Sequence, residues 1–132
     1  MLSKLLEGIK NYYPDKIIMG ASMIPNQNFS SSPIEPYNAV FAFNRLIENA
    51  EISILYDNYS LSRISQQQFK LANPTMQDMN FLISHYMSTV TAAFRFPCSN
   101  INDMRKIATS SVPFPRVHFF MPILANLQPR FS

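Results

Sequence analysis

The side chains of this chain that could bind a ligand are mainly amides and carboxylates. Asn58 and Asn80 each offer a hydrogen-bond donor and an acceptor, and Glu35 offers a carboxylate that accepts. Each also has an ordinary structural role: Asn58 would cap a helix, Glu35 would place a charge at a helix N-terminus, and Asn80 would be a solvated polar residue. Residue type alone leaves both interpretations open.

Composition argues against two other kinds of site. The chain has only two glycines, Gly8 and Gly20, whereas a loop that cradles phosphate groups needs several. The single cysteine, Cys98, excludes an internal disulfide, and with His85 and His118 it lacks the spacing of metal ligands. We therefore expect neither a glycine-rich phosphate loop nor a metal site within this sequence.

Length and charge limit the classes of protein to which this chain can belong. A chain of 132 residues with 47% apolar residues can bury the core of one domain. The net charge is +3, but the basic residues are scattered singly apart from Arg105-Lys106, which argues against a nucleic-acid partner. There is no signal peptide pattern, and no apolar run approaches the ~20 residues of a membrane span. With one cysteine, these features predict a soluble cytoplasmic protein.

Prolines and apolar periodicity divide the chain into alternating helices and strands. The expected helices and strands are listed here by residue number: helices at about 4–13, 36–47, 58–67, 75–95 and 101–108, and strands at 16–23, 52–56 and 117–124. Asn100 is expected to cap the last helix, with Asp103 in its first turn. The alternation predicts a parallel α/β sheet with helices packed on its faces.

The longest predicted helix is the element that must organise the others. Thr75 and Asp78, three residues apart after Pro74, are typical of a helix start. An apolar stripe follows at helical spacing, made of Met79, Ile83, Tyr86, Val90 and Ala93. Further apolar residues lie off that stripe, so we expect a helix buried on several sides. At ~1.5 Å per residue it is ~30 Å long, enough to cross a domain.

Four stretches of unusual residue order occur along the chain. They are YPDKI at 13–17, IEPYNA at 34–39, the block from LANPT at 71–75 to RFP at 95–97, and SVPFPRVHFFMP at 111–122. In this order and spacing they resemble the tubulin family, and within it the β-type chains. The resemblance covers nearly the whole sequence but only a middle portion of a tubulin.

The resemblance implies a particular fold and domain organisation. It implies a partial parallel-sheet nucleotide-binding fold, with residues 1–97 as the C-terminal part of a GTPase domain that includes the central helix 75–95. Residues 98–132 would begin a second α+β domain.

The resemblance also assigns half of a guanine-nucleotide site. In the family, a glutamate matching Glu35 contacts the ribose, and asparagines matching Asn58 and Asn80 contact the guanine. Met76 stands where the family usually has a tyrosine that stacks on the base, and a methionine can touch the ring face more weakly. GTP is thus the implied cofactor.

Departures from the family pattern limit this site. Ser31 replaces a usual aspartate, and the family's phosphate loop lies upstream with no counterpart here. Most phosphate-binding energy comes from such loops and from the Mg²⁺ expected in the full family fold. We therefore expect this chain alone to bind GTP poorly or not at all.

A further implied role is contact with a neighbouring subunit's nucleotide. Lys106 stands where α-type chains carry a catalytic glutamate, and a lysine neutralises phosphate charge but does not orient water as a carboxylate does. Asp103 and Lys106 are assigned to this interface, and the alternative for Lys106 is a solvated basic helix face. No catalytic residue is assigned. Cys98 replaces a glycine in the preceding loop.

Three functional hypotheses follow. The first is a β-tubulin-like structural constituent of the microtubule cytoskeleton in the cytoplasm, with an α-type chain as heterodimer partner. The second is a truncated or degenerate tubulin-derived product that does not polymerise and at most docks onto tubulin subunits or chaperone-like folding factors. The third, a free-standing GTPase, is disfavoured by the missing phosphate loop and acid. Sequencing the transcript upstream of Met1 would separate them.

Overall fold

The computed structural model describes residues 2–26, 28, 32–96 and 103–123. Within these ranges the elements follow in the order α1 (Leu2–Tyr12), β1 (Met19–Ile24), α2 (Glu35–Asn49), β2 (Ile52–Asp57), α3 (Asn58–Phe69), α4 (Met76–Arg95), α5 (Met104–Ser111) and β3 (Phe119–Phe120). The mixed α/β class expected from the sequence is confirmed.

The strands form one parallel sheet in the order β1-β2-β3. Met19 pairs with Ile52 at the start of the first ladder, and Ile24 pairs with Asp57 at its end. Ser53 and Ile54 pair with Phe119 and Phe120 in the second ladder. The sheet order therefore matches the chain order, and the carboxyl ends of β1 and β2 meet at one edge of the sheet.

The start of β1 lies later than the predicted residues 16–23. The Ile18 backbone N–H donates to Glu51 Oε2 at 2.7 Å, while the Ile18 carbonyl accepts the backbone N–H groups of Glu51 and Ile52. Glu51 also pairs with Lys10 of α1. A side chain thus takes the Ile18 N–H, while the Ile18 carbonyl begins the ladder in which Met19 pairs with Ile52.

The last strand is shorter than the predicted residues 117–124. Arg116 has a left-handed φ of 74°, so the chain turns just before this segment. Pro122 lacks the N–H that a further ladder bond would need. Pairing is confined to Phe119–Phe120 among the residues described, and Leu124 lies outside them.

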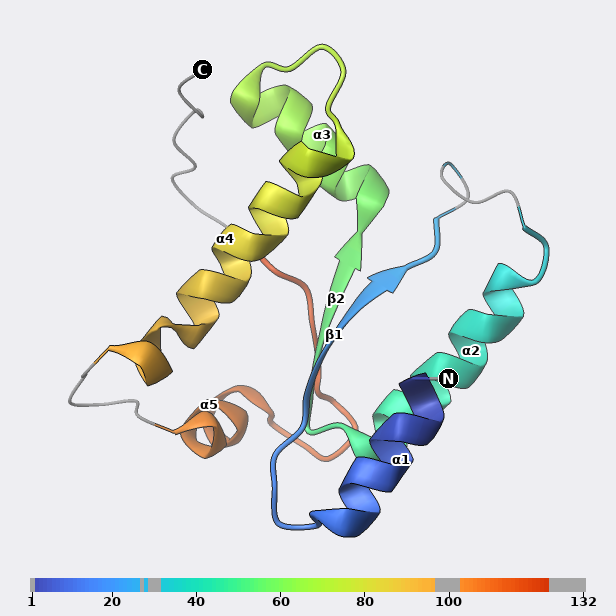
Figure 1. Cartoon of the computed structure of the whole chain (residues 1–132), viewed down its shortest axis with the longest axis vertical. Helices are drawn as coiled ribbons and strands as arrows, with labels where there is room; N and C mark the ends of the chain where they lie inside the picture. Colours follow the sequence, from blue (N-terminus) through green and yellow to red (C-terminus); the bar gives the residue numbers. More distant parts are fainter. Residues whose placement is uncertain (1, 27, 29–31, 97–102, 124–132) are drawn as a thin grey trace.

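Helices cover both faces of the sheet. Figure 1 shows α1 and α2 side by side on one side of the sheet, with α3 and α4 on the other. Alternate residues of β2 point toward α3 and α4 and form one core cluster: Ile52, Ile54 and Tyr56 with Leu61, Met79 and Leu82. A second cluster, Leu6, Leu46 and Ala50, lies on the α1 and α2 side. Phe119 packs against this second cluster and Phe120 against the first, as expected for neighbours in a strand.

The α4 helix is the longest described element, with 20 residues. Its predicted start is confirmed, because Thr75 and Asp78 form a reciprocal capping box. Of the predicted burial on several sides, the described structure shows full burial only on the side that faces β2. Met79 and Leu82 are buried against β2, whereas Phe81 remains 38% exposed. On another side of the helix, Phe81 meets Phe69 of α3 edge to face, with ring centroids 6.4 Å apart.

The start of α5 also differs from the prediction. Asp103 is the N-cap, and its Oδ1 accepts the Arg105 backbone N–H at 3.1 Å. It was expected three positions after the cap, inside the first turn, so the helix starts three residues later than predicted. The proposed cap, Asn100, lies outside the described residues. Asp103 takes the cap position because its extended backbone lets the carboxylate reach the first free N–H groups of the helix.

Candidate functional site

A cleft of about 400 Å³ lies at the carboxyl ends of β1 and β2. In parallel α/β sheets, ligands bind outside the carboxyl ends of the strands, where loops and helix N-termini converge. The lining residues come from the end of β1, the segment after it, and the starts of α2 and α3: Met23, Ile24, Pro25, Asn26, Glu35, Asn38, Ala39, Ala42 and Asn58. This cleft is the strongest candidate for a ligand site.

Glu35 enters the cleft from the first residue of α2. The N-cap of α2 is Ile34, which has no side chain able to accept from the helix, and Pro36 follows without an N–H group to satisfy. The Glu35 carboxylate therefore lies at the positive end of the helix dipole, where a negative charge is stabilised. Its side chain is partly buried and remains able to accept hydrogen bonds from a ligand.

Asn58 enters the cleft from the first residue of α3, and it does not cap that helix. The cap is Asp57, whose carboxylate accepts the backbone N–H groups of Tyr59 and Ser60, both at 3.2 Å. The structural alternative in which Asn58 caps α3 is therefore wrong. Asn58 lines the cleft, and its side-chain amide has no hydrogen-bond partner among the described residues.

Asp57 is held as a carboxylate by its neighbours. Burial alone would raise its pKa, but hydrogen bonds from the Ser60 hydroxyl, from the Tyr59 and Ser60 backbone and from the Asn26 amide together lower the pKa below its ordinary value. The Ser60 hydroxyl donates at 2.8 Å and Asn26 Nδ2 at 3.1 Å. The charged form is thus favoured where it caps α3.

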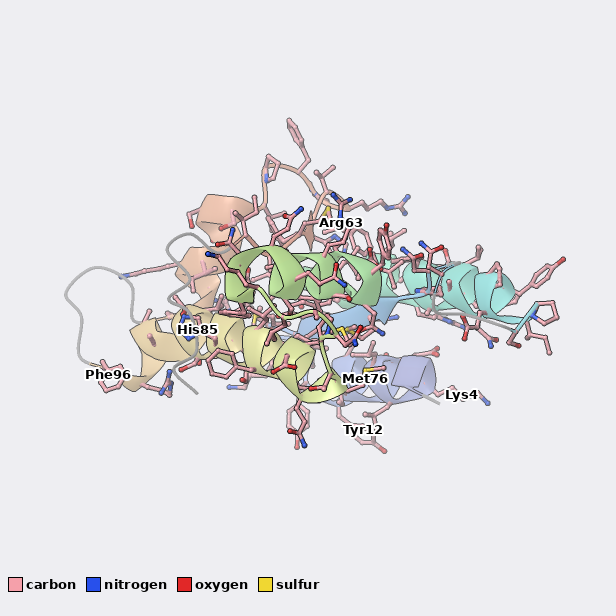
Figure 2. The ribbon with its side chains drawn as sticks, turned by 90° about the horizontal axis from the view of Figure 1, so that it is seen from above. Lys4, Tyr12, Arg63, Met76, His85 and Phe96 are labelled. Carbon is pink, nitrogen blue, oxygen red and sulfur yellow. The ribbon has the colours of Figure 1, made fainter. Side chains whose placement is uncertain are left out.

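Met76 and Asn80 occupy a different place. Both lie in the first turns of α4 and both are exposed, Met76 by 58%. Figure 2 shows Met76 and Phe96 at opposite ends of this helix. Neither Met76 nor Asn80 is among the residues that line the cleft. The structure brings Glu35 and Asn58 together and leaves the two α4 residues outside this lining.

Asp103 and Lys106 lie together at the N-terminus of α5, and neither residue lines the cleft. Asp103 is occupied as the helix cap, while Lys106 is exposed. The opposite side of α5 is apolar, because Ile107 and Ala108 pack against the first core cluster. The charged side of the helix is therefore available to a partner. Ser31 and Cys98 lie outside the described residues.

The chemistry of the cleft fits the nucleoside part of a ligand. One carboxylate, from Glu35, and two amides, from Asn38 and Asn58, offer donors and acceptors of the kind that pair with a heterocyclic base and with ribose hydroxyls. No lysine or arginine is among the described lining residues, so this lining supplies no charge to hold phosphate groups. In the described part of the chain, His, Cys, Asp and Glu side chains form no cluster of three or more that could hold a metal.

Two lining residues, Asn26 and Asn38, were missed from the sequence. Asn26 directly follows Pro25 at the end of a strand, a position where loop residues commonly form ligand sites. Asn38 lies one helical turn after Glu35, so it shares a face with it. Both signals were present in the sequence once the strand end and the helix start were fixed.

None of the described helices is long and apolar enough to cross a membrane. The parallel sheet with helices on both faces defines the class of α/β domains. A profile of the Tubulin/FtsZ family, GTPase domain, matches residues 1–66, which is half of the chain. The chain belongs to the tubulin family.

Curated relatives agree with this assignment and with the β-type resemblance. The tubulin beta-6 chain of Gallus gallus is 44% identical over 128 residues, and the tubulin beta chain of Enteroctopus dofleini is 43% identical over 128 residues. Each alignment covers 97% of this chain but 29% of the relative. The chain therefore spans less than a third of the length of these relatives.

Proposed function

We propose that the cleft binds the base and ribose of a guanine nucleotide, as the nucleoside half of a GTP site in a tubulin-type subunit. Glu35 would accept from the ribose hydroxyls and Asn58 would pair with the guanine edge. The observation that carries this proposal is that Glu35 and Asn58, from two helices, line one cleft at the carboxyl edge of a sheet in a GTPase-domain family. The unpaired Asn58 amide supports it further.

The remaining parts of the proposed site come from α4 and from outside this chain. Asn80 would contact the base and Met76 its ring face, and both are exposed and available on α4. Phosphate groups and their Mg²⁺ would be held by residues beyond those that line the cleft. We therefore expect the isolated chain to bind GTP no tighter than about millimolar, roughly −4 kcal/mol.

The binding test is an NMR titration of the ¹⁵N-labelled chain with GTP and with ATP, following the side-chain amide signals. The compared variants are Asn58→Ala, Asn80→Ala and, as a control, Asn44→Ala, because Asn44 is exposed on α2 and does not line the cleft. Loss of a paired hydrogen bond to the base costs about 1–3 kcal/mol, so Asn58→Ala should abolish the preference for GTP over ATP.

Two results would contradict this proposal. Micromolar binding by the unmodified chain would show that phosphate contacts exist which the cleft lining does not provide. Equal weakening of GTP and ATP by Asn58→Ala would show that this amide does not read the base.

At the level of the whole protein, we propose a structural constituent of the microtubule cytoskeleton in the cytoplasm, which pairs with an α-type tubulin chain. The support is membership of the family and identity to β-type chains over nearly all of this sequence. We place the end of the GTPase domain near residue 97, after α4, with residues 98–132 beginning the second domain. Asp103 and Lys106 would contact the nucleotide of the neighbouring subunit, a role that their exposed position at the start of α5 supports.

A second candidate is a product that does not polymerise and docks onto tubulin subunits or folding factors. Large exposed apolar side chains favour it, because such surface is usually covered by a partner. They occur on α1, on α2 and around β3, and include Tyr12, Tyr37, Phe41, Phe114 and Met121, each at least 68% exposed.

Co-sedimentation separates the two candidates. The chain would be mixed with tubulin under polymerising conditions and then under depolymerising conditions. A constituent should enter the pellet with the polymer in constant proportion to tubulin. A docking product should remain in the supernatant with unpolymerised subunits.

A further inference from the structure

Asn26 joins two segments that border the cleft. Its side chain lies just beyond β1, and its Nδ2 donates to Asp57 Oδ1 at 3.1 Å, across 31 residues of sequence. Its Oδ1 accepts the backbone N–H of Asn28 at 3.0 Å. Both ends of this amide are therefore bonded, one to its own loop and one to the start of α3.

The partner of Asn26 is the residue that fixes the first turn of α3. One Asp57 oxygen accepts from Tyr59 N–H as well as from Asn26, and the other accepts from the Ser60 N–H and hydroxyl. Asn58 lies between the cap residue and the N–H groups that it captures. The backbone on both sides of Asn58 is therefore held by the same carboxylate that Asn26 bonds.

We propose that Asn26 is a positioning residue of the cleft: its bond to Asp57 holds the loop after β1 against the start of α3 and keeps the Asn58 amide directed into the cleft. This inference rests on the proposed function only for the identity of the ligand, a guanine nucleoside moiety. Asn26 itself lines the cleft, but its amide groups are already bonded, so it acts through Asp57 and not by recognising the base.

The donor and acceptor of this bond can be exchanged. Asn26→Asp removes the donor and sets a second carboxylate against Asp57, while a carboxylate at position 26 still accepts from Asn28. Combining Asn26→Asp with Asp57→Asn reverses the bond, and an asparagine at position 57 remains a good helix cap. Asn44→Asp makes the same change of charge on an exposed part of α2 and serves as the control.

The experiment uses the full ¹⁵N- and ¹³C-labelled chain with GTP as the probe. Without ligand, NOE contacts between residue 26 and residues 57–58 and the Asn58 side-chain signals report the position of that amide. With GTP, the shift of the Asn58 signals gives the apparent affinity. We expect Asn26→Asp to lose the NOE contacts and to weaken GTP binding about fivefold or more, and the double exchange to restore both. Asn44→Asp should match the unmodified chain.

Each result decides the inference. An Asn58 amide that keeps its contacts and its GTP response in Asn26→Asp would overturn it. Loss that the double exchange does not restore would also overturn it, because the effect would then come from charge or from unfolding and not from this bond. If GTP shifts no cleft signal in the unmodified chain, the proposed function fails. The ligand-free NOE contacts would then still show whether Asn26 positions Asn58.

Discussion

Tyr56 places an unpartnered phenol in the core, and this predicts a specific alkaline transition. The side chain is 3% exposed, and its hydroxyl has no hydrogen-bond partner among the residues that the structure describes. Its ring meets Tyr86 edge to face, with centroids 6.0 Å apart. Burial, with a smaller contribution from Tyr86, raises the pKa of Tyr56 from 10.0 to about 12. The folded state therefore resists ionisation of this tyrosine.

The magnitude follows from linkage. Because the folded pKa is raised, the stability associated with neutral Tyr56 is fully present below pH 10 and is lost as the pH rises toward 12. Two pKa units at about 1.4 kcal/mol each give a loss of about 2–3 kcal/mol over this interval. Tyr56→Phe removes the titrating group, so its free energy of unfolding should fall less over the same interval. Below pH 10 it should be at least as stable as the unmodified chain, because no hydrogen bond is lost.

Urea denaturation at pH 8, and at several values from pH 10 to 12, measures this difference. Tyr12→Phe is the matched control, because Tyr12 is 83% exposed and its removal should leave the profile unchanged. A Tyr56→Phe profile parallel to that of the unmodified chain across the whole range would refute the reasoning. It would mean that Tyr56 ionises as readily in the folded state as in the unfolded state.

Two further predictions concern packing and surface. Leu82 on α4 is 1% exposed and packs against β2, so Leu82→Ala should lower the free energy of unfolding by about 2–5 kcal/mol. Phe114 is 68% exposed, so the control Phe114→Ala should change this free energy by about 0.5 kcal/mol or less. Equal effects of the two substitutions in chemical denaturation would contradict the assigned core. The exposed apolar side chains of α1, α2 and the β3 region predict self-association at micromolar concentration, and a single monomeric species in sedimentation velocity would contradict this.

The sequence predicted the alternation of elements well, because prolines and helix caps act locally. The capping box at Thr75 and the proline at position 36 mark their helices without help from tertiary contacts. The prediction from sequence was wrong where a residue distant in the chain determines the boundary of an element. The start of β1 depends on Glu51, which is 33 residues from Ile18 and captures its N–H.

The candidate site was predictable in part for the same reason. The resemblance supplied Glu35 and Asn58, and the structure places both on one cleft. The sequence could not show whether Asp57 or Asn58 caps α3, because aspartate and asparagine both cap helices well. In the structure Asp57 has the extended backbone of the cap, and Asn58 is the first residue of the helix. The bond from Asn26 to Asp57 could not be predicted, because the two residues lie 31 positions apart.

The order of strands in the sheet has a consequence for synthesis on the ribosome. Each strand pairs with the one that precedes it in the chain, β2 with β1 and then β3 with β2. A nascent chain that emerges N-terminus first can therefore add each strand to an edge that already exists. Among the described strands, the β1–β2 pair forms without β3, so this pair should gain protease protection before β3 has left the exit tunnel.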